Sequence, residues 1–251
     1  MKTVAIGDVH GTRYWEDVVQ RESDADTFVF VGDYFDSFDI PYREQVSNFR
    51  GIMSFKQLEQ DAGKKVVTLI GNHDYHYLPY INETNTSGFQ RSKAILLKEL
   101  LSEYIDGLDI CYCVDGLLFS HAGVSEEFLN RHYGIGNWSA AQIQSDVANL
   151  FNYKPQTFSF SNEAMKLNQY PDPSGNDTWQ GPLWIRPRAL MEANKGGDLE
   201  QQYIQIFGHT AHTEDIDVSG RYINIDSLHS YGKKQYIVVE DGKIQLKQLS
   251  L

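Results

Sequence analysis

Six residues that commonly bind metal ions each follow a short apolar stretch of the sequence. Two aspartates, one asparagine and three histidines share this placement: Asp8, His10, Asp33, Asn72, His121 and His209. Carboxylates reduce the positive charge of bound cations, and imidazoles favour manganese, iron, zinc or cobalt over magnesium or calcium. The set can hold two divalent ions if one carboxylate bridges them. Ions about 3.5–4 Å apart can activate a shared water and hold a phosphoryl group.

The turns that carry these residues have a common design. Apolar stretches at residues 1–6, 27–31 and 65–70 are each followed by a glycine and then by Asp8, Asp33 or Asn72. Open α/β sheets place their sites beyond the carboxyl ends of strands. Glycine at such an end allows a tight turn and a close approach by other groups. We therefore expect these turns to form the walls of one site.

The remaining pattern predicts the elements that position the turns. Helical spacing predicts helices at residues 14–22, 42–60, 92–104, 126–132 and 140–151. Hairpins are expected at 108–120 and 236–249, and further strands at 203–207 and 222–225. Residues 75–90 and 154–181 show no clear period and predict irregular structure. We expect one domain over residues 1–251, with α/β elements first and more antiparallel strands later.

Composition excludes several classes of protein. The net charge of −12 argues against nucleic-acid binding, which usually needs a basic face. Cys111 and Cys113 are two residues apart on a predicted strand, so we expect free thiols and no disulfide between them. No apolar run reaches membrane-spanning length, and a strand stands where a signal peptide would have its apolar stretch. We expect a cytoplasmic protein.

Five motifs give the sequence a family resemblance. They are Gly-Asp-Val-His-Gly at 7–11, Gly-Asp-Tyr-Phe-Asp at 32–36, Gly-Asn-His-Asp at 71–74, Ser-His-Ala-Gly at 120–123 and Gly-His-Thr at 208–210. In this order they resemble the blocks of the calcineurin-like metallophosphoesterases, most closely the phosphoprotein phosphatase branch with its bacterial and phage members. The resemblance implies an α/β fold of two packed mixed β-sheets flanked by helices, with a dimetal site at one end.

The resemblance also implies a ligand set and a substrate. Asp8, His10 and Asp33 would bind the first ion, with Asp33 as the bridge. Asn72, His121 and His209 would bind the second ion. We expect manganese, with iron, zinc or cobalt as alternatives. The partner would be a phosphorylated substrate, either a phosphoprotein or a small phosphoester.

Three further residues would act on the substrate. His73 resembles the general acid of the family, and Asp36 would orient it. An imidazole beside a carboxylate is favoured in its protonated form, which a basic leaving group needs. Leu183-Trp184-Ile185-Arg186 resembles the Trp-x-Arg block of the family, so Arg186 would clamp the phosphate. The second arginine of the family is replaced by Ser37, which leaves the substrate class open.

These observations favour a metal-dependent phosphatase acting on phosphomonoesters, with a Ser/Thr protein phosphatase as one form. The alternative is a nucleotide or diadenosine-polyphosphate hydrolase, because members of the family differ mainly in their loops. A nuclease is disfavoured by the net charge and because nuclease-like members carry a ligand histidine where this chain has Ala211; His212 falls one residue later. An inactive scaffold would have lost ligands or the acid, whereas all these positions are filled here.

Overall fold

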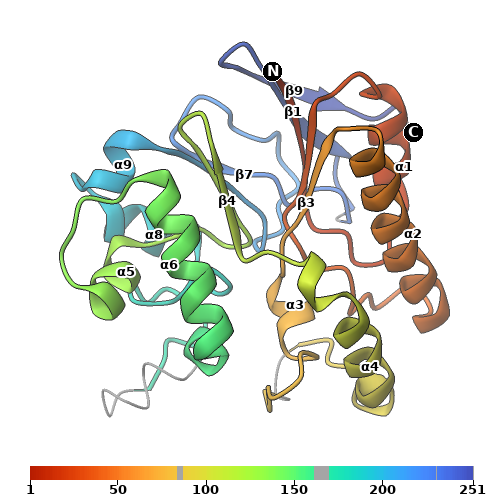
Figure 1. Cartoon of the computed structure of the whole chain (residues 1–251), viewed down its shortest axis with the longest axis horizontal. Coiled ribbons are helices and arrows are strands. Elements are labelled where there is room, and N and C mark those ends of the chain that lie inside the picture. Colours follow the sequence, from red (N-terminus) through yellow and green to blue (C-terminus); the bar gives the residue numbers. More distant parts are fainter. Residues whose placement is uncertain (84–86, 161–169, 230, 251) are drawn as a thin grey trace. The chain divides into compact units, whose positions relative to one another are not determined.

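The chain forms two compact units, each with its own sheet. The computed structural model describes residues 1–83, 87–160, 170–229 and 231–250. Unit 1 comprises Met1–Asp109, Ala211–Ile216 and Ile225–Leu251, and unit 2 comprises Ile110–Thr210 and Asp217–Asn224. Both sheets are mixed and flanked by helices (Figure 1). The predicted α/β fold with two mixed sheets is confirmed, while the single domain stays a prediction.

The sheet of unit 1 has the order β3-β2-β1-β8-β9. Its strands are β1 (Lys2–Ile6), β2 (Thr27–Phe30), β3 (Lys65–Thr68), β8 (Gln235–Glu240) and β9 (Lys243–Gln248). The first three strands are parallel, and β8 runs antiparallel to both β1 and β9. β2 is buried along its whole length, as is β1 after its first residue. Burial on both faces explains why these strands are nearly continuous apolar runs.

The helices of unit 1 follow the predicted pattern with one addition. They are α1 (Tyr14–Arg21), α2 (Tyr42–Asp61), α3 (Asn72–Tyr75) and α4 (Ala94–Tyr104), with 3₁₀ turns η1 (Arg91–Lys93) and η2 (Ile105–Gly107). α1 buries Trp15 and Val18, which are one turn apart. The Trp15 indole donates a 2.7 Å hydrogen bond to Asn48 on α2, which ties the two helices together. The short helix α3 was not predicted.

The sheet of unit 2 has the order β4-β5-β6-β7. Its strands are β4 (Cys111–Val114), β5 (Leu117–Ser120), β6 (Ile204–Phe207) and β7 (Tyr222–Asn224). The first two form the predicted hairpin, whose turn residues Asp115 and Gly116 have φ of 48° and 77°. Positive φ at both central residues is typical of a type I′ turn. β5, β6 and β7 are parallel, and both cysteines are free thiols as predicted.

The helices of unit 2 begin at residues suited to that position. They are α5 (Glu126–Tyr133), α6 (Ala140–Tyr153), α8 (Pro187–Asn194) and α9 (Asp198–Gln202), with the 3₁₀ turn η3 (Pro155–Phe158). The hydroxyls of Ser125 and Ser139 cap α5 and α6 by accepting from backbone N–H groups of the first turn. Pro187 opens α8, where a missing N–H costs nothing. α9 was not predicted.

Two of the predicted irregular segments are only partly within the described residues. Residues 84–86 of the segment 75–90 and residues 161–169 of the segment 154–181 lie outside them. None of the helices in the described ranges combines the length and apolar character needed to cross a membrane.

Candidate metal centre and active site

Three parallel strand ends bring the first three turns of unit 1 to one edge of the sheet. Ile6 pairs with Phe30, and Phe30 pairs with Thr68, so β1, β2 and β3 end level. The turn after β1 is then fixed to the turn after β2, because the N–H groups of Val9 and His10 both donate to the Asp33 carbonyl at 3.1 and 2.7 Å. The regular pairing of short apolar strands thus determines where the polar turn residues lie.

Asp8, His10 and Asp33 form a compact group of candidate ligands. One ligand atom from each lies within 4.8 Å of the other two. Both carboxylates are buried, and burial lowers the pKa of His10 to about 4, so its ring is neutral. His10 Nδ1 lies 2.7 Å from the Phe35 carbonyl and therefore donates its proton there. Its Nε2 lone pair lies 3.5 Å from Asp33 Oδ2. Two electron-pair donors facing each other fit a bound cation.

The backbone at these turns adopts conformations that most residues avoid. Four predicted site residues have φ in the left-handed region: His10 at 41°, Asp33 at 53°, Asp36 at 65° and His209 at 65°. Such conformations persist only where surrounding contacts fix them, and they cluster at functional sites. Asp33 also needs a glycine beside it, because a Cβ atom on Gly71 would lie 2.1 Å from Asp33 Oδ1.

Asp74 fixes the second and third turns to each other. Its buried carboxylate accepts backbone hydrogen bonds from Asp33, Tyr34 and Gly71 at 2.8, 2.8 and 2.9 Å. The backbone N–H of His73 donates to Asp33 Oδ1 at 2.9 Å. Asn72, at the start of α3, is buried beside these contacts. The motif Gly-Asn-His-Asp thus supplies a candidate ligand, a candidate acid and a structural carboxylate in consecutive positions.

The His73 ring is paired with Asp36, as the sequence led us to expect. His73 Nδ1 lies 3.0 Å from Asp36 Oδ2, and the two rings of His73 and His10 are 5.1 Å apart between centroids. Burial alone would lower the pKa of His73, but the carboxylates of Asp33 and Asp36 raise it to about 9. His73 is therefore protonated at neutral pH and can donate a proton. Its role as the acid stays a prediction.

A second group with metal-ligand geometry includes the Asp36 carboxylate. Asp36, His73 and His76 each offer one atom within 4.8 Å of the others. His76 Nε2 lies 2.7 Å from Asp36 Oδ2, and Tyr77 donates its hydroxyl to Asp36 Oδ1 at 2.6 Å. The sequence predicted only an irregular loop for this stretch. No periodic pattern could have shown that His76 reaches back to Asp36.

His229 was not predicted to lie at the site, whereas Asp226 resembles the acid that family members place after their last block and was expected to form structural hydrogen bonds. The His229 ring is 4.3 Å from the His10 ring between centroids, and its Nδ1 is 3.0 Å from Asp226 Oδ1. Both residues belong to unit 1 and follow β7 in the sequence. The sequence shows a carboxylate directly after an apolar strand there, which resembles the other site turns, but no preceding glycine marks it.

In unit 2, two further predicted ligands lie together at the end of parallel strands. The Gly208 N–H donates to the His121 carbonyl at 2.7 Å, and the rings of His121 and His209 are 5.1 Å apart between centroids. His209 Nε2 lies 3.2 Å from the Trp184 carbonyl, where it donates a proton. In that tautomer the lone pair of the ring is on Nδ1. The roles of His121 and His209 as ligands stay predictions.

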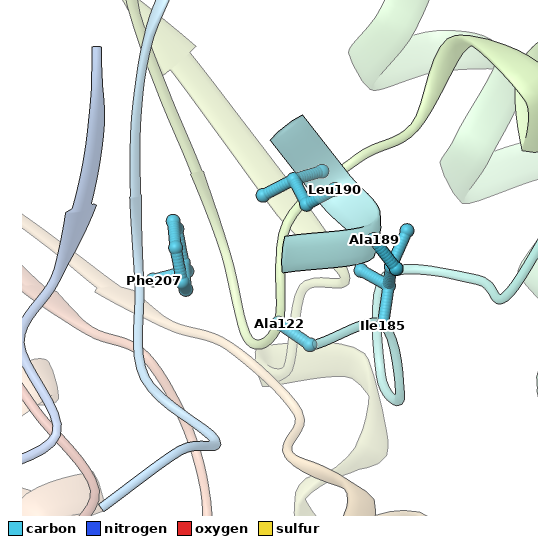
Figure 2. Packing of buried hydrophobic residues seen from close by; sticks show 5 residues of the cluster. All are labelled: Ala122, Ile185, Ala189, Leu190 and Phe207. Atoms are coloured by element: carbon cyan, nitrogen blue, oxygen red, sulfur yellow. The ribbon is translucent and has the colours of Figure 1, made fainter. Parts of the chain in front are cut away.

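An apolar cluster supports this end of unit 2. Figure 2 shows its members, Ala122, Ile185, Ala189, Leu190 and Phe207. Ala122 directly follows His121, and Phe207 precedes His209 by two residues. Packing of these neighbours at 0–1% exposure fixes the backbone from which the two histidines project.

The Arg186 side chain is held next to His209. Its Nη1 donates to the His209 carbonyl at 2.9 Å and to Thr210 Oγ1 at 3.0 Å, and its Nε donates to the Ser174 carbonyl at 3.2 Å. These bonds orient the guanidinium before any ligand binds. The binding of phosphate by Arg186 stays a prediction.

Two departures from the family pattern now have a structural description. Ser37 Oγ accepts hydrogen bonds from the backbone N–H groups of Asp39 and Ile40 at 3.3 and 3.1 Å. The residue in place of the second arginine thus stabilises its own loop. His212 Nδ1 contacts the Glu214 carbonyl at 3.1 Å, a local contact two residues along the chain.

Comparison with known proteins identifies what this arrangement resembles. The family model of the calcineurin-like phosphoesterases matches residues 1–212. The structure is similar to a cold-active protein-tyrosine phosphatase of Shewanella sp., with 16% identity, a TM-score of 0.66 and coverage of 99% of this chain and 80% of that chain. It is also similar to a protein serine/threonine phosphatase from Saccharomyces cerevisiae, with 13% identity, a TM-score of 0.58 and coverage of 100% and 80%. No curated protein sequence matches significantly. At these identities the solved structures show a shared fold.

Proposed function

Because the chain belongs to the calcineurin-like phosphoesterases, we propose that it hydrolyses phosphomonoesters, with phosphoserine and phosphothreonine in proteins as the substrate class. Family membership makes it a metal-dependent phosphoester hydrolase with a phosphorylated substrate. The observation that supports the finer proposal is the His73–Asp36 pair, whose acid ring lies 5.1 Å from the ring of the candidate ligand His10.

A protonated acid matters most for substrates with a basic leaving group. The alkoxide released from phosphoserine or phosphothreonine must gain a proton as the ester bond breaks. The phenolate of tyrosine, whose conjugate acid has a pKa of about 10, needs this help less. The two similar structures are named as a tyrosine and as a serine/threonine phosphatase, and the His73–Asp36 pair favours the second substrate class for this chain.

The proposed ligand set is the one that the family resemblance implies. Asp8, His10 and Asp33 would hold one ion, and their mutual distances fit a cation. Asn72, His121 and His209 would hold the other, with Asp33 shared between both. When bound, the two ions would supply an activated water and Lewis-acid stabilisation of the phosphoryl oxygens. We expect manganese as the native ion. A cytoplasmic location also remains a prediction from the sequence.

The other residues would bind and protonate the substrate. The planar guanidinium of Arg186 matches two phosphoryl oxygens, and its hydrogen bonds to His209 and Thr210 preorganise it. His73 would give its proton to the leaving oxygen while Asp36 keeps Nδ1 occupied, so that Nε2 is the donating atom. This proton transfer from His73 Nε2 needs no movement of the buried Asp36.

A substrate panel tests the proposal. The protein loaded with manganese is assayed against phosphoserine, phosphothreonine and phosphotyrosine peptides, mononucleotides and dinucleoside polyphosphates. We expect the highest kcat/KM on phosphoserine or phosphothreonine peptides. Higher kcat/KM on dinucleoside polyphosphates or nucleotides would overturn the protein-phosphatase proposal and support the nucleotide-hydrolase alternative.

A further inference from the structure

Within the proposed function, we infer that His76 is a positioning residue of the phosphoester hydrolysis. It holds the Asp36 carboxylate in the one orientation that aims His73 at the leaving group. His76 itself is fully buried, and it acts only through Asp36.

The carboxylate of Asp36 is saturated by four donors. Its Oδ2 faces His76 Nε2 at 2.7 Å and His73 Nδ1 at 3.0 Å. Its Oδ1 accepts from the Tyr77 hydroxyl at 2.6 Å and from Gln90 Nε2 at 3.1 Å. An ionised carboxylate has about four lone-pair sites, so all of them are used. Rotation of Asp36 away from His73 would break the other three bonds.

His76 can hold this position because its own ring is fixed. The side chains of His76 and Asp36 are both 0% exposed. The His76 ring packs edge-on against Tyr77 and Phe89, with centroid distances of 4.4 and 5.0 Å. By contrast, the His73 side chain retains 17% exposure. One histidine on Asp36 is thus locked inside the protein, and the other reaches the solvent side where a substrate would bind.

The short distances favour hydrogen bonds over a further metal site. Zinc ligands at about 2.0–2.1 Å in tetrahedral geometry lie about 3.3 Å from one another. The two nitrogen–oxygen distances here are 2.7 and 3.0 Å, which are hydrogen-bond lengths. In addition, both imidazoles address the same oxygen of Asp36, so a proton between each pair explains the geometry without a cation.

Loss of the His76 donor should impair proton delivery specifically. Asp36 would lose its shorter bond on Oδ2 and gain freedom to turn, and His73 would lose part of its orientation. A well-placed general acid contributes about 10²–10⁴-fold to the rate. We expect loss of its positioning to cost about 10–100-fold in kcat on an alkyl phosphate. The loss on nitrophenyl phosphate should be under about threefold, since that leaving group hardly needs a proton.

The experiment compares variants of the manganese-loaded full chain on phosphoserine and on nitrophenyl phosphate. His76→Phe keeps a ring against Tyr77 and Phe89 but cannot donate, whereas His76→Gln restores an N–H donor. His73→Asn is the reference for a lost acid. His132→Ala removes a histidine of unit 2 that packs on Phe128, and it serves as the unaffected control. Metal content is measured for every variant.

The expected result has three parts. His76→Phe keeps its metal and loses activity mainly on phosphoserine, His76→Gln recovers most of that loss, and the double variant with His73→Asn is no slower than His73→Asn alone. The inference is overturned if His76→Phe and His76→Gln lose equal activity on both substrates. It is also overturned if the double variant is slower than His73→Asn alone. If the wild type hydrolyses neither phosphate, the proposed function itself fails and this inference falls with it.

Discussion

Replacement of Arg186 by alanine should remove two contributions of one side chain. The guanidinium donates to the His209 carbonyl, to Thr210 Oγ1 and to the Ser174 carbonyl at 2.9–3.2 Å. In our proposal it also binds phosphoryl oxygens. The variant therefore loses support for the turn that carries His209 as well as a charge partner for the substrate.

The two losses have different sizes and can be separated. At a net contribution of about 1 kcal/mol for each hydrogen bond, the free energy of unfolding should fall by about 2–3 kcal/mol, because the bond to Ser174 is exposed. Loss of a preorganised charge partner typically costs about 2–4 kcal/mol in kcat/KM, which is about 30- to 900-fold. The effect should be larger on a monoester, whose dianion has more charge and more free oxygens than a diester.

The assay uses nitrophenyl phosphate and bis-nitrophenyl phosphate at one manganese concentration. Arg186→Lys retains the charge without the planar fork and should recover only part of the monoesterase activity. Arg221→Ala, an exposed arginine of the same unit, controls for loss of positive charge. Thermal unfolding, followed in parallel, confirms that each variant is folded at the assay temperature.

Two results would refute this reasoning. A folded Arg186→Ala variant with unchanged kcat/KM on the monoester would show that the guanidinium serves the fold alone. A wild type that prefers the diester would contradict the monoesterase proposal, and the search for a substrate would move to nucleotides and dinucleoside polyphosphates.

Three further perturbations test the metal centre, the acid and the fold. Asp33→Asn should lower both metal content and activity, because one carboxylate serves two ions; full turnover by verified metal-free wild type would contradict this. His73→Asn should keep both metals yet lose activity. The rate of the metal-loaded wild type on alkyl phosphates should fall as pH rises through the pKa of His73, and this decline should be absent in the variant. The charge of Asp33 helps to raise that pKa to about 9 when no cation is bound, so bound cations should shift the decline to lower pH. Burial would raise the pKa of Glu22, but hydrogen bonds from Lys2 and Tyr236 hold it below its usual value of 4.5. The stabilisation from Glu22 is thus present above that value and lost as pH falls through the folded-state pKa. Glu22→Gln should destabilise by about 1–3 kcal/mol at pH 7, with the difference shrinking towards pH 3 in urea unfolding; an equal difference at both pH values would contradict the mechanism.

The sheets could be predicted because burial leaves a direct trace in the sequence. β1, β2 and β3 are apolar runs ended by glycine, and their level pairing follows from parallel strands of similar length. Helix α1 could be predicted from the spacing of its buried residues. Helix α2 could be predicted from its apolar spacing, but only Phe49 and Ile52 of that set are buried, and the other buried residues of the helix are the polar Gln45, Asn48 and Lys56. The short helices α3 and α9 could not, because four or five residues give too little periodicity to stand out from a turn.

The candidate site was predicted only where a turn repeats the same design. Asp8, Asp33 and Asn72 follow strand and glycine, and the family motifs added His73 and Asp36. His229 and His76 were missed for a different reason. His229 contacts His10 across more than two hundred residues of sequence, and His76 belongs to a loop without a period. Their positions depend on how distant segments pack, which cannot be predicted from composition or from the spacing of residues.

Residue type alone also fails to separate the three aspartates of the second and third turns. Asp33, Asp36 and Asp74 are all buried, yet different donors reach each of them. Asp74 accepts three backbone N–H groups and therefore holds the two turns together. Asp36 is surrounded by side-chain donors, which fix its carboxylate in the position where it accepts the hydrogen bond from His73 Nδ1. Asp33 has the lone pair of His10 Nε2 facing one oxygen at 3.5 Å, an arrangement that suits a cation. The chemistry of each carboxylate thus follows from its donors, and those are set by the fold.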